Sequence, residues 1–302
     1  MTRLVRAAVW VAIALAAILG LALVSFFAFP AQRERVMGMR PPRARVVRPP
    51  ADAELSSLRD VAFRTADGLA LRAWYAPSAN GAAIVLAHGY AGNRMQFVNE
   101  ARLLVRAGYG VLLFDFRGQG ESEGDRIGIG DPARRDVRAA IAFAASQPDV
   151  NADRLGIVGF SAGAAPVAQV AADDPRIRAV ALEGSAASLE SAMRHHRGRL
   201  GRLWVGPVLL LLRAAGIDVD ATRADTAVPR IAPRPLLLVH GDQEPDSVQM
   251  GMRTLYAKAH MPKRLLIVRG AGHGHYAKAP EGEVYERELL ALFNGALTQT
   301  GR

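Results

Sequence analysis

The sequence predicts an α/β protein with a mostly parallel central sheet and helices on both faces. Short, wholly apolar runs alternate along the chain with helical stretches, and strands buried on both faces have this composition. The runs cover residues 83–87, 111–116, 155–160, 179–182, 236–239 and 265–268. Their alternation with helices is typical of a parallel sheet covered on two sides. A strand pair at 61–63 and 69–75, joined by Ala66-Asp67-Gly68, is expected to precede them.

The helices between these runs have recognisable starts, of which Asp131-Pro132 is the clearest. A capping acceptor followed by proline at the first helical position predicts a helix to about Ser146. Between about 185 and 230 the alternation lapses, and we expect a small helical lid above the sheet. Its apolar run at 203–212 is too short to cross a bilayer, so it indicates a buried lid helix. The alternative is an acyl-binding wall that also touches the membrane surface.

Composition excludes several classes of function. The 302 residues can bury a substantial core, and they include no cysteine, which excludes disulfides, thiolate metal sites and a thiol nucleophile. The formal net charge is +10, but nearly all of the basic excess is arginine, with lysine only at 258, 263 and 278. Because no recognition motif or basic-aromatic stripe accompanies the charge, we expect no nucleic-acid partner.

The N-terminal region, residues 1–31, predicts a membrane anchor. Residues 7–30 carry no charged side chain and are long enough for one transmembrane helix. A cleaved signal peptide is the alternative, but the exit from the run, residues 26–30, is a poor cleavage site. The arginines that follow the run outnumber those before it, which favours a single-pass protein of the cell membrane with a cytoplasmic catalytic domain.

An Arg/Pro-rich stretch at 32–54 then predicts an extended linker rather than part of a core. The globular domain is expected over residues 55–302. A chain that begins near Ala51 should therefore keep its activity.

The residues with the clearest chemistry are Gly159-Phe160-Ser161-Ala162-Gly163, between an apolar strand and an alanine-rich helix. In this context the pattern predicts a sharp turn that presents the hydroxyl of Ser161 as a nucleophile. Glycines are expected on both sides because side chains there would collide with the strand and the helix. The backbone N–H of Ala162 would face the oxygen that becomes negative during acyl transfer.

A second oxyanion donor should come from the loop after an earlier strand. His88-Gly89-Tyr90 follows the strand at 83–87, and the backbone N–H of Tyr90 is the candidate. We expect His88 to order this turn and not to act in catalysis, since a general base must reach the serine oxygen.

At this point the chain resembles the α/β-hydrolase superfamily, specifically the serine aminopeptidase-like and Bem46-like hydrolases. The resemblance spans about residues 55–294 and rests on residues 88–94, on Phe114-Asp115-Phe116-Arg117-Gly118-Gln119-Gly120-Glu121-Ser122, and on the turn at Ser161. It implies the α/β-hydrolase fold, and it implies that Asp115 and Arg117 are architectural. It also implies that the nucleophile is followed along the chain by an acid and then by a histidine.

The acid and the base are expected after the last two strands. His240-Gly241-Asp242-Gln243-Glu244 is similar to a family element that usually ends in aspartate, so Glu244 is the candidate acid. Asp242, Asp246 and Glu183 are the alternatives.

His273, in Ala271-Gly272-His273-Gly274-His275, is the candidate base, and His275 is the alternative. A metal site at the paired histidines 273 and 275 is not expected, because His195-His196 belongs to the distant lid and no carboxylate cluster is adjacent. We expect neither a cofactor nor a metal.

Together these residues predict a membrane-anchored serine hydrolase that cleaves carboxylic esters or related acyl substrates through an acyl-enzyme. The substrate would be a small or lipid-like acyl compound. A serine peptidase or an acyltransferase would use the same machinery. A non-catalytic membrane scaffold that keeps the fold is the alternative of another class.

Overall fold

The computed structural model describes residues 3–28, 38–50, 52–196, 198–214 and 216–297. It comprises two compact units, residues 1–41 and 42–302. The first contains helix α1 (Arg3–Ala28), in the region where the sequence predicts a transmembrane helix. Within the described residues, however, no helix has both the length and the apolar character needed to cross a membrane. The predicted transmembrane helix is therefore not confirmed, and the membrane location stays a prediction.

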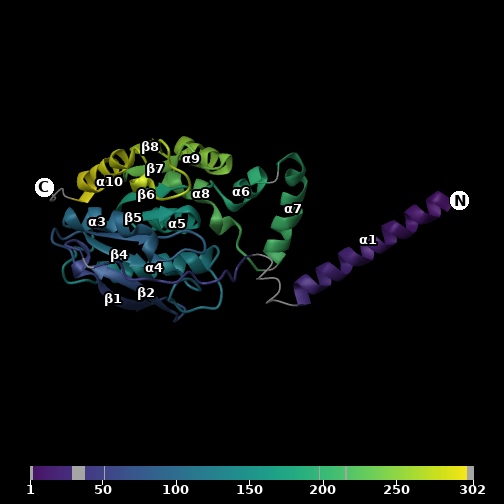
Figure 1. Ribbon diagram of the computed structural model, residues 1–302, viewed down its shortest axis with the longest axis horizontal. Helices are drawn as coiled ribbons and strands as arrows, with labels where there is room; N and C mark the ends of the chain where they lie inside the picture. The colour runs from purple at the N-terminus through teal and green to yellow at the C-terminus, as the bar shows by residue number, and fades with distance from the viewer. Residues whose placement is uncertain (1–2, 29–37, 51, 197, 215, 298–302) are drawn as a thin grey trace. The chain divides into compact units, whose positions relative to one another are not determined.

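The second unit is built on an eight-stranded sheet with the order β1-β2-β4-β3-β5-β6-β7-β8 (Figure 1). The strands are β1 (Arg59–Arg64), β2 (Ala70–Ala76), β3 (Ala83–Ala87), β4 (Gly110–Phe114), β5 (Leu155–Phe160), β6 (Ile177–Glu183), β7 (Leu236–Gly241) and β8 (Lys263–Val268). β2 runs antiparallel to both of its neighbours, and all other pairs are parallel. The predicted mostly parallel sheet, with its initial antiparallel pair, is confirmed.

Helices cover both faces of this sheet. The helices are α3 (Val98–Arg106), α4 (Asp131–Ala145), α5 (Ala164–Asp173), α8 (Ala224–Ala227), α9 (Asp246–Lys258) and α10 (Gly282–Leu297). Successive residues of a strand point to opposite faces, so Val85 of β3 joins a core with α4, α5, α8 and α9, while Ile84 and Leu86 join a core with α3 and α10. Burial on both faces explains the apolar composition of the central strands. β8 lies at the edge, and several of its residues are partly or fully exposed.

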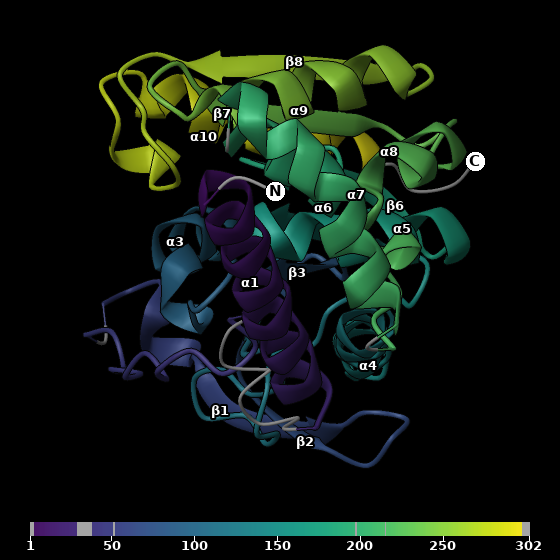
Figure 2. The same cartoon turned by 90° about the vertical axis from the view of Figure 1, so that its right-hand side faces the viewer.

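The lid contains α6 (Leu189–His196) and α7 (Gly198–Ala214), which precede α8. Both views place them beside each other, with α6 next to α9 (Figure 2). Val205 and Leu209 of α7 are buried, whereas Leu210 is 67% exposed. This pattern is that of an amphipathic helix with a packed face and agrees with a buried lid helix. The side chains of 195–204, which include His195-His196, lie outside the described residues.

The second half of the predicted linker is extended and bound to the domain. The Arg43 guanidinium donates hydrogen bonds to the carbonyls of Ser122, at 2.6 Å, and Gly124. The Asn93 amide donates to the carbonyls of Ala44 and Arg45 at 3.1 and 3.2 Å. Residues 42–50 thus form a strap across two loops of the sheet, whereas residues 32–37 of the predicted linker lie outside the described residues.

Candidate active site

Ser161 lies on a sharp turn between β5 and the short helix η3 (Ser161–Gly163), which leads into α5. Its φ of +51° is unusual for a residue with a side chain. A Cβ on Gly163 would lie 2.4 Å from the His88 carbonyl oxygen, and one on Gly159 would lie 2.8 Å from Cβ of Val167. The steric reason predicted for the two flanking glycines is therefore correct, because strand β3 and helix α5 occupy the space that side chains would need.

His273 faces Ser161 from the loop after β8. Its Nε2 lies 2.9 Å from Oγ of Ser161, although the two residues are separated by 112 positions in the sequence. The imidazole packs against the Phe160 ring at a centroid distance of 4.7 Å, and its side chain is 40% exposed. One edge of the ring is thus fixed by contacts with the protein, while the site stays open to a substrate.

Glu244 completes the arrangement from the loop after β7. Its Oε2 lies 3.3 Å from Nδ1 of His273, and its side chain is fully buried. Its Oε1 accepts hydrogen bonds from the Gly241 N–H, at 3.3 Å, and from the Tyr276 hydroxyl. The tautomer that fits both contacts carries its proton on Nδ1, toward Glu244, and presents the lone pair of Nε2 to Ser161.

None of the alternative acids, and not the alternative base His275, contacts Ser161 or His273 in the hydrogen bonds of the described residues. The Asp242 carboxylate accepts the Gly270 N–H at 2.8 Å, and Asp246 begins α9 at the surface. Glu183 is buried against the Tyr285 hydroxyl at 2.8 Å, and burial raises the pKa of its carboxyl well above the ordinary value. His275 is exposed, with a φ of +57°. The structure therefore groups Ser161 with His273 and Glu244 rather than with these residues.

The predicted oxyanion turn lies directly against Ser161. A Cβ on Gly89 would lie 2.9 Å from the Phe160 ring and 3.1 Å from Cβ of Ser161, so glycine favours this close approach. Ala162 follows the serine within η3. Tyr90 is 51% exposed, so the group that it can offer to the site is its backbone N–H rather than its side chain.

His88 orders this turn, as expected. Its Nε2 accepts the Phe116 N–H at 3.1 Å, and its Nδ1 donates to the Gly89 carbonyl at 2.7 Å. Burial lowers the pKa of its imidazole, so the ring stays neutral in this tautomer. Both ring nitrogens are thus used within the protein.

Two further residues of the site were not predicted from the sequence. The Gln96 side chain accepts the Gly89 N–H at 3.0 Å and holds the turn before Tyr90. Tyr276 donates its hydroxyl to Glu244. Neither residue belongs to a pattern, although Tyr276 follows His273 by only three positions, and this proximity is the one available indication.

The segment from Phe114 to Ser122 is architectural, as the resemblance implies. Asp115 is completely buried, and its Oδ1 accepts the Arg94 N–H at 2.7 Å while its Oδ2 pairs with the Arg94 guanidinium. Arg117 pairs with Asp136 at 2.7 Å. These buried, hydrogen-bonded pairs fix the loop after β4.

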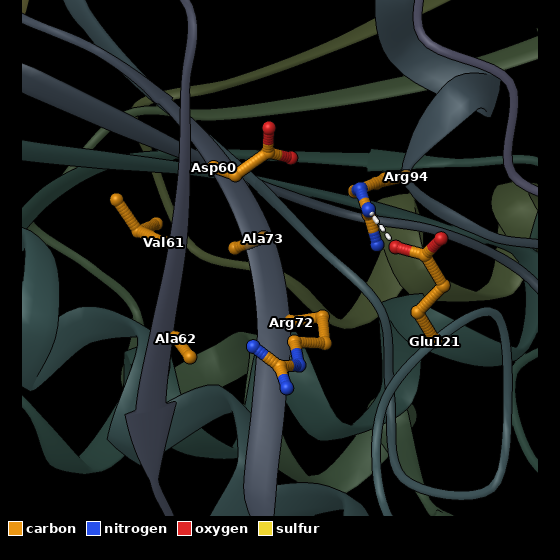
Figure 3. Close-up of a pocket in the computed structure, with 7 residues that line it drawn as sticks. All are labelled: Asp60, Val61, Ala62, Arg72, Ala73, Arg94 and Glu121. Carbon is orange, nitrogen blue, oxygen red and sulfur yellow. Dashed lines mark hydrogen bonds and ion pairs between the residues drawn. The ribbon is translucent and has the colours of Figure 1, made fainter.

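A cavity of about 450 Å³ lies over β1 and β2 (Figure 3). Its lining is formed by Asp60, Val61, Ala62, Arg72, Ala73, Arg94 and Glu121. Arg94 and Glu121 form an ion pair on one side of it, and none of its lining residues belongs to the Ser161 site (Figure 3). Among the described residues, no three histidine or acidic side chains are grouped so that they could hold a metal ion.

Comparison with known proteins identifies the family. A family model described as serine aminopeptidase, S33, matches residues 78–220. The protein Rv2307c of Mycobacterium tuberculosis is 31% identical over 228 residues, which cover 74% of this chain and 75% of that protein. The chain belongs to the α/β-hydrolase superfamily. The resemblance noted from residues 88–94, 114–122 and 159–163 is thereby confirmed.

The chain is also similar to a second bacterial protein and to a solved structure. The protein YfhR of Escherichia coli (strain K12) is 29% identical over 252 residues, which cover 80% of this chain and 82% of that protein. A structure of the Pyrococcus furiosus esterase Pf2001 matches with a TM-score of 0.68 at 20% identity, covering 84% of this chain and 99% of the esterase chain. At this identity the match shows the fold. The family membership supports a hydrolase.

Proposed function

We propose that this chain is a serine hydrolase that cleaves carboxylic esters or related acyl compounds through an acyl-enzyme on Ser161. The observation that carries the proposal is the 2.9 Å contact between Oγ of Ser161 and Nε2 of His273, made from a strained turn that directs the serine out of the sheet. A serine and a histidine in this relation form an activated nucleophile and its base.

In the first half of the reaction, Oγ of Ser161 attacks the acyl carbon while Nε2 of His273 takes the hydroxyl proton. The imidazolium that forms is stabilised by Glu244 through Nδ1. The tetrahedral intermediate then expels the alcohol, which receives the proton from Nε2. In the second half, Nε2 removes a proton from water, the hydroxyl attacks the acyl carbon, and the acid leaves as Ser161 regains its proton.

The carbonyl oxygen becomes negative in both tetrahedral intermediates. The backbone N–H groups of Ala162 and Tyr90 are the proposed donors to it. Support comes from the close packing of Gly89 on Ser161 and from the position of Ala162 in η3. Donors fixed in advance stabilise the developing charge without reorganisation, which is the largest effect in many acyl-transfer enzymes.

The same residues could transfer the acyl group to another acceptor or cleave an amide. The family model that matches the chain is described as a peptidase. The ester preference is therefore tested by comparing p-nitrophenyl esters with aminoacyl p-nitroanilides, with and without an added alcohol acceptor. Faster turnover of the anilide, or acyl transfer to the alcohol that exceeds hydrolysis, would assign the peptidase or acyltransferase alternative.

The nucleophile is tested with a fluorophosphonate probe. We expect the purified chain to be labelled, and Ser161→Ala to abolish labelling and ester hydrolysis while the melting temperature changes little. Ser247→Ala, a partly exposed serine of α9, is the matched control and should keep both signals. Labelling that persists in Ser161→Ala would refute this nucleophile, and an unlabelled wild type would favour a non-catalytic scaffold.

A further inference from the structure

The carboxylate of Glu244 is held at both oxygens, and the deeper one is held by a tyrosine. Tyr276, in the short helix η6 (Tyr276–Lys278), donates its hydroxyl to Oε1, which also accepts the Gly241 N–H at 3.3 Å. Oε2 is left for His273. The terminal torsion of a glutamate is broad, so these two donors select the plane in which Oε2 faces the imidazole.

The position of Tyr276 is fixed by its surroundings. The side chain is 1% exposed and lies between the rings of Phe160, at 6.3 Å, and Tyr285, at 5.6 Å. Gly184 leaves room for its hydroxyl, because a Cβ there would come within 2.6 Å of that oxygen. The hydroxyl therefore has little freedom to turn away from Glu244.

The same surroundings keep Tyr276 protonated. Burial and the nearby Glu244 charge raise the pKa of its hydroxyl well above the ordinary value. A phenol that stays protonated remains a hydrogen-bond donor throughout the pH range in which the site works. Tyr276 therefore stays a hydrogen-bond donor to the carboxylate in every step.

We propose that Tyr276 is a positioning residue of this hydrolase, which fixes the Glu244 carboxylate so that one oxygen faces His273 throughout the reaction. The proposal rests on the proposed function of Ser161 and His273. It also gives a reason for glutamate at a position where the resembling family usually has aspartate. From the same backbone position aspartate is shorter by one bond, about 1.5 Å, and could not reach Tyr276 and His273 together.

The test is a double-mutant cycle between Tyr276→Phe and Glu244→Asp, measured as kcat and KM on one p-nitrophenyl ester and as the rate of fluorophosphonate labelling. In the wild-type background, Tyr276→Phe should lower kcat and the labelling rate about tenfold, with KM within twofold, since a bond to the carboxylate is lost. In the Glu244→Asp background, the same change should alter kcat less than twofold, because the contact is already broken.

Tyr285→Phe is the matched control, since it removes a neighbouring buried hydroxyl that contacts Glu183 instead. It should leave kcat within twofold of the wild type. If Tyr276→Phe does not fold, Gly184→Ala takes its place, because the added Cβ would push against the Tyr276 hydroxyl. This variant should lower kcat without raising KM. Equal losses in both backgrounds, an unchanged kcat in Tyr276→Phe, or an equal loss in Tyr285→Phe would overturn the proposal.

Failure of this proposal is distinguishable from failure of the proposed function. If the wild type is labelled and Ser161→Ala is not, the nucleophile stands whatever the cycle shows. If the wild type neither reacts with the probe nor hydrolyses esters, the proposed function fails, and the positioning role fails with it.

Discussion

Replacing Glu244 with glutamine probes the site most sharply, because the two ends of the new amide are not equivalent. Two donors, the Gly241 N–H and the Tyr276 hydroxyl, face Oε1, whereas His273 faces Oε2. In Glu244→Gln the amide oxygen should turn to the two donors and its NH₂ group to His273. Nδ1 must then accept, the proton moves to Nε2, and the ring can no longer take the Ser161 proton.

The expected fall in kcat can be estimated from the free-energy cost of turning the amide in Glu244→Gln the other way, the orientation that would keep the productive histidine tautomer. With NH₂ toward Gly241 and Tyr276, at least one buried donor loses its acceptor, which costs about 1–3 kcal/mol for each unmatched group. A difference of about 2 kcal/mol leaves roughly one molecule in thirty with the productive tautomer. The carboxylate charge that stabilises the imidazolium is also lost. We therefore expect kcat to fall about a thousandfold or more, equal to about 4 kcal/mol of barrier.

The assay is kcat on an activated p-nitrophenyl ester, with melting temperatures measured alongside. Asp242→Asn is the matched control, because its carboxylate instead accepts the Gly270 N–H, and kcat should remain within tenfold of the wild type. Glu183→Gln should also affect kcat less than Glu244→Gln. Near-normal turnover in Glu244→Gln together with collapse in Asp242→Asn would refute this reasoning and transfer the role to Asp242.

Two further predictions concern stability. Burial raises the pKa of the Glu100 carboxyl to about 7, so the folded state binds its proton more tightly than the unfolded state, and stability falls as pH rises between the two pKa values. In the wild type, the free energy of unfolding measured by chemical denaturation should therefore fall by on the order of 3 kcal/mol between pH 5 and 8. Glu100→Gln should remove this fall, whereas the exposed control Glu283→Gln should keep it. Equal dependence of the unfolding free energy on pH in all three proteins would contradict the assignment. A chain beginning at Ala51 loses the strap formed by residues 42–50 and should be about 2 kcal/mol less stable than one beginning at Pro42. Equal melting temperatures of the two chains would show that the strap does not contribute.

Much of the fold was predictable because burial determines which residue types a strand can contain. A strand covered on both faces must be apolar along its length, so runs such as 83–87 and 155–160 indicate a parallel sheet. The edge strand β8 shows this pattern less clearly because part of it faces solvent. The strap at 42–50 has no such pattern, since most of its hydrogen bonds, such as those of Arg43 and Asn93, end on backbone carbonyls, which every residue has.

The sequence by itself determined the turn at Ser161, because its two glycines answer a local steric need that any strand-to-helix turn of this kind imposes. It also narrowed the histidine and the acid to a few neighbouring residues. Only the tertiary structure decided that His273 rather than His275 faces Ser161, and that Glu244 rather than Asp242 faces His273. It alone revealed Tyr276 behind Glu244. The physical reason is that hydrogen bonds between distant loops depend on side-chain direction and burial, which the order of residues along the chain does not specify.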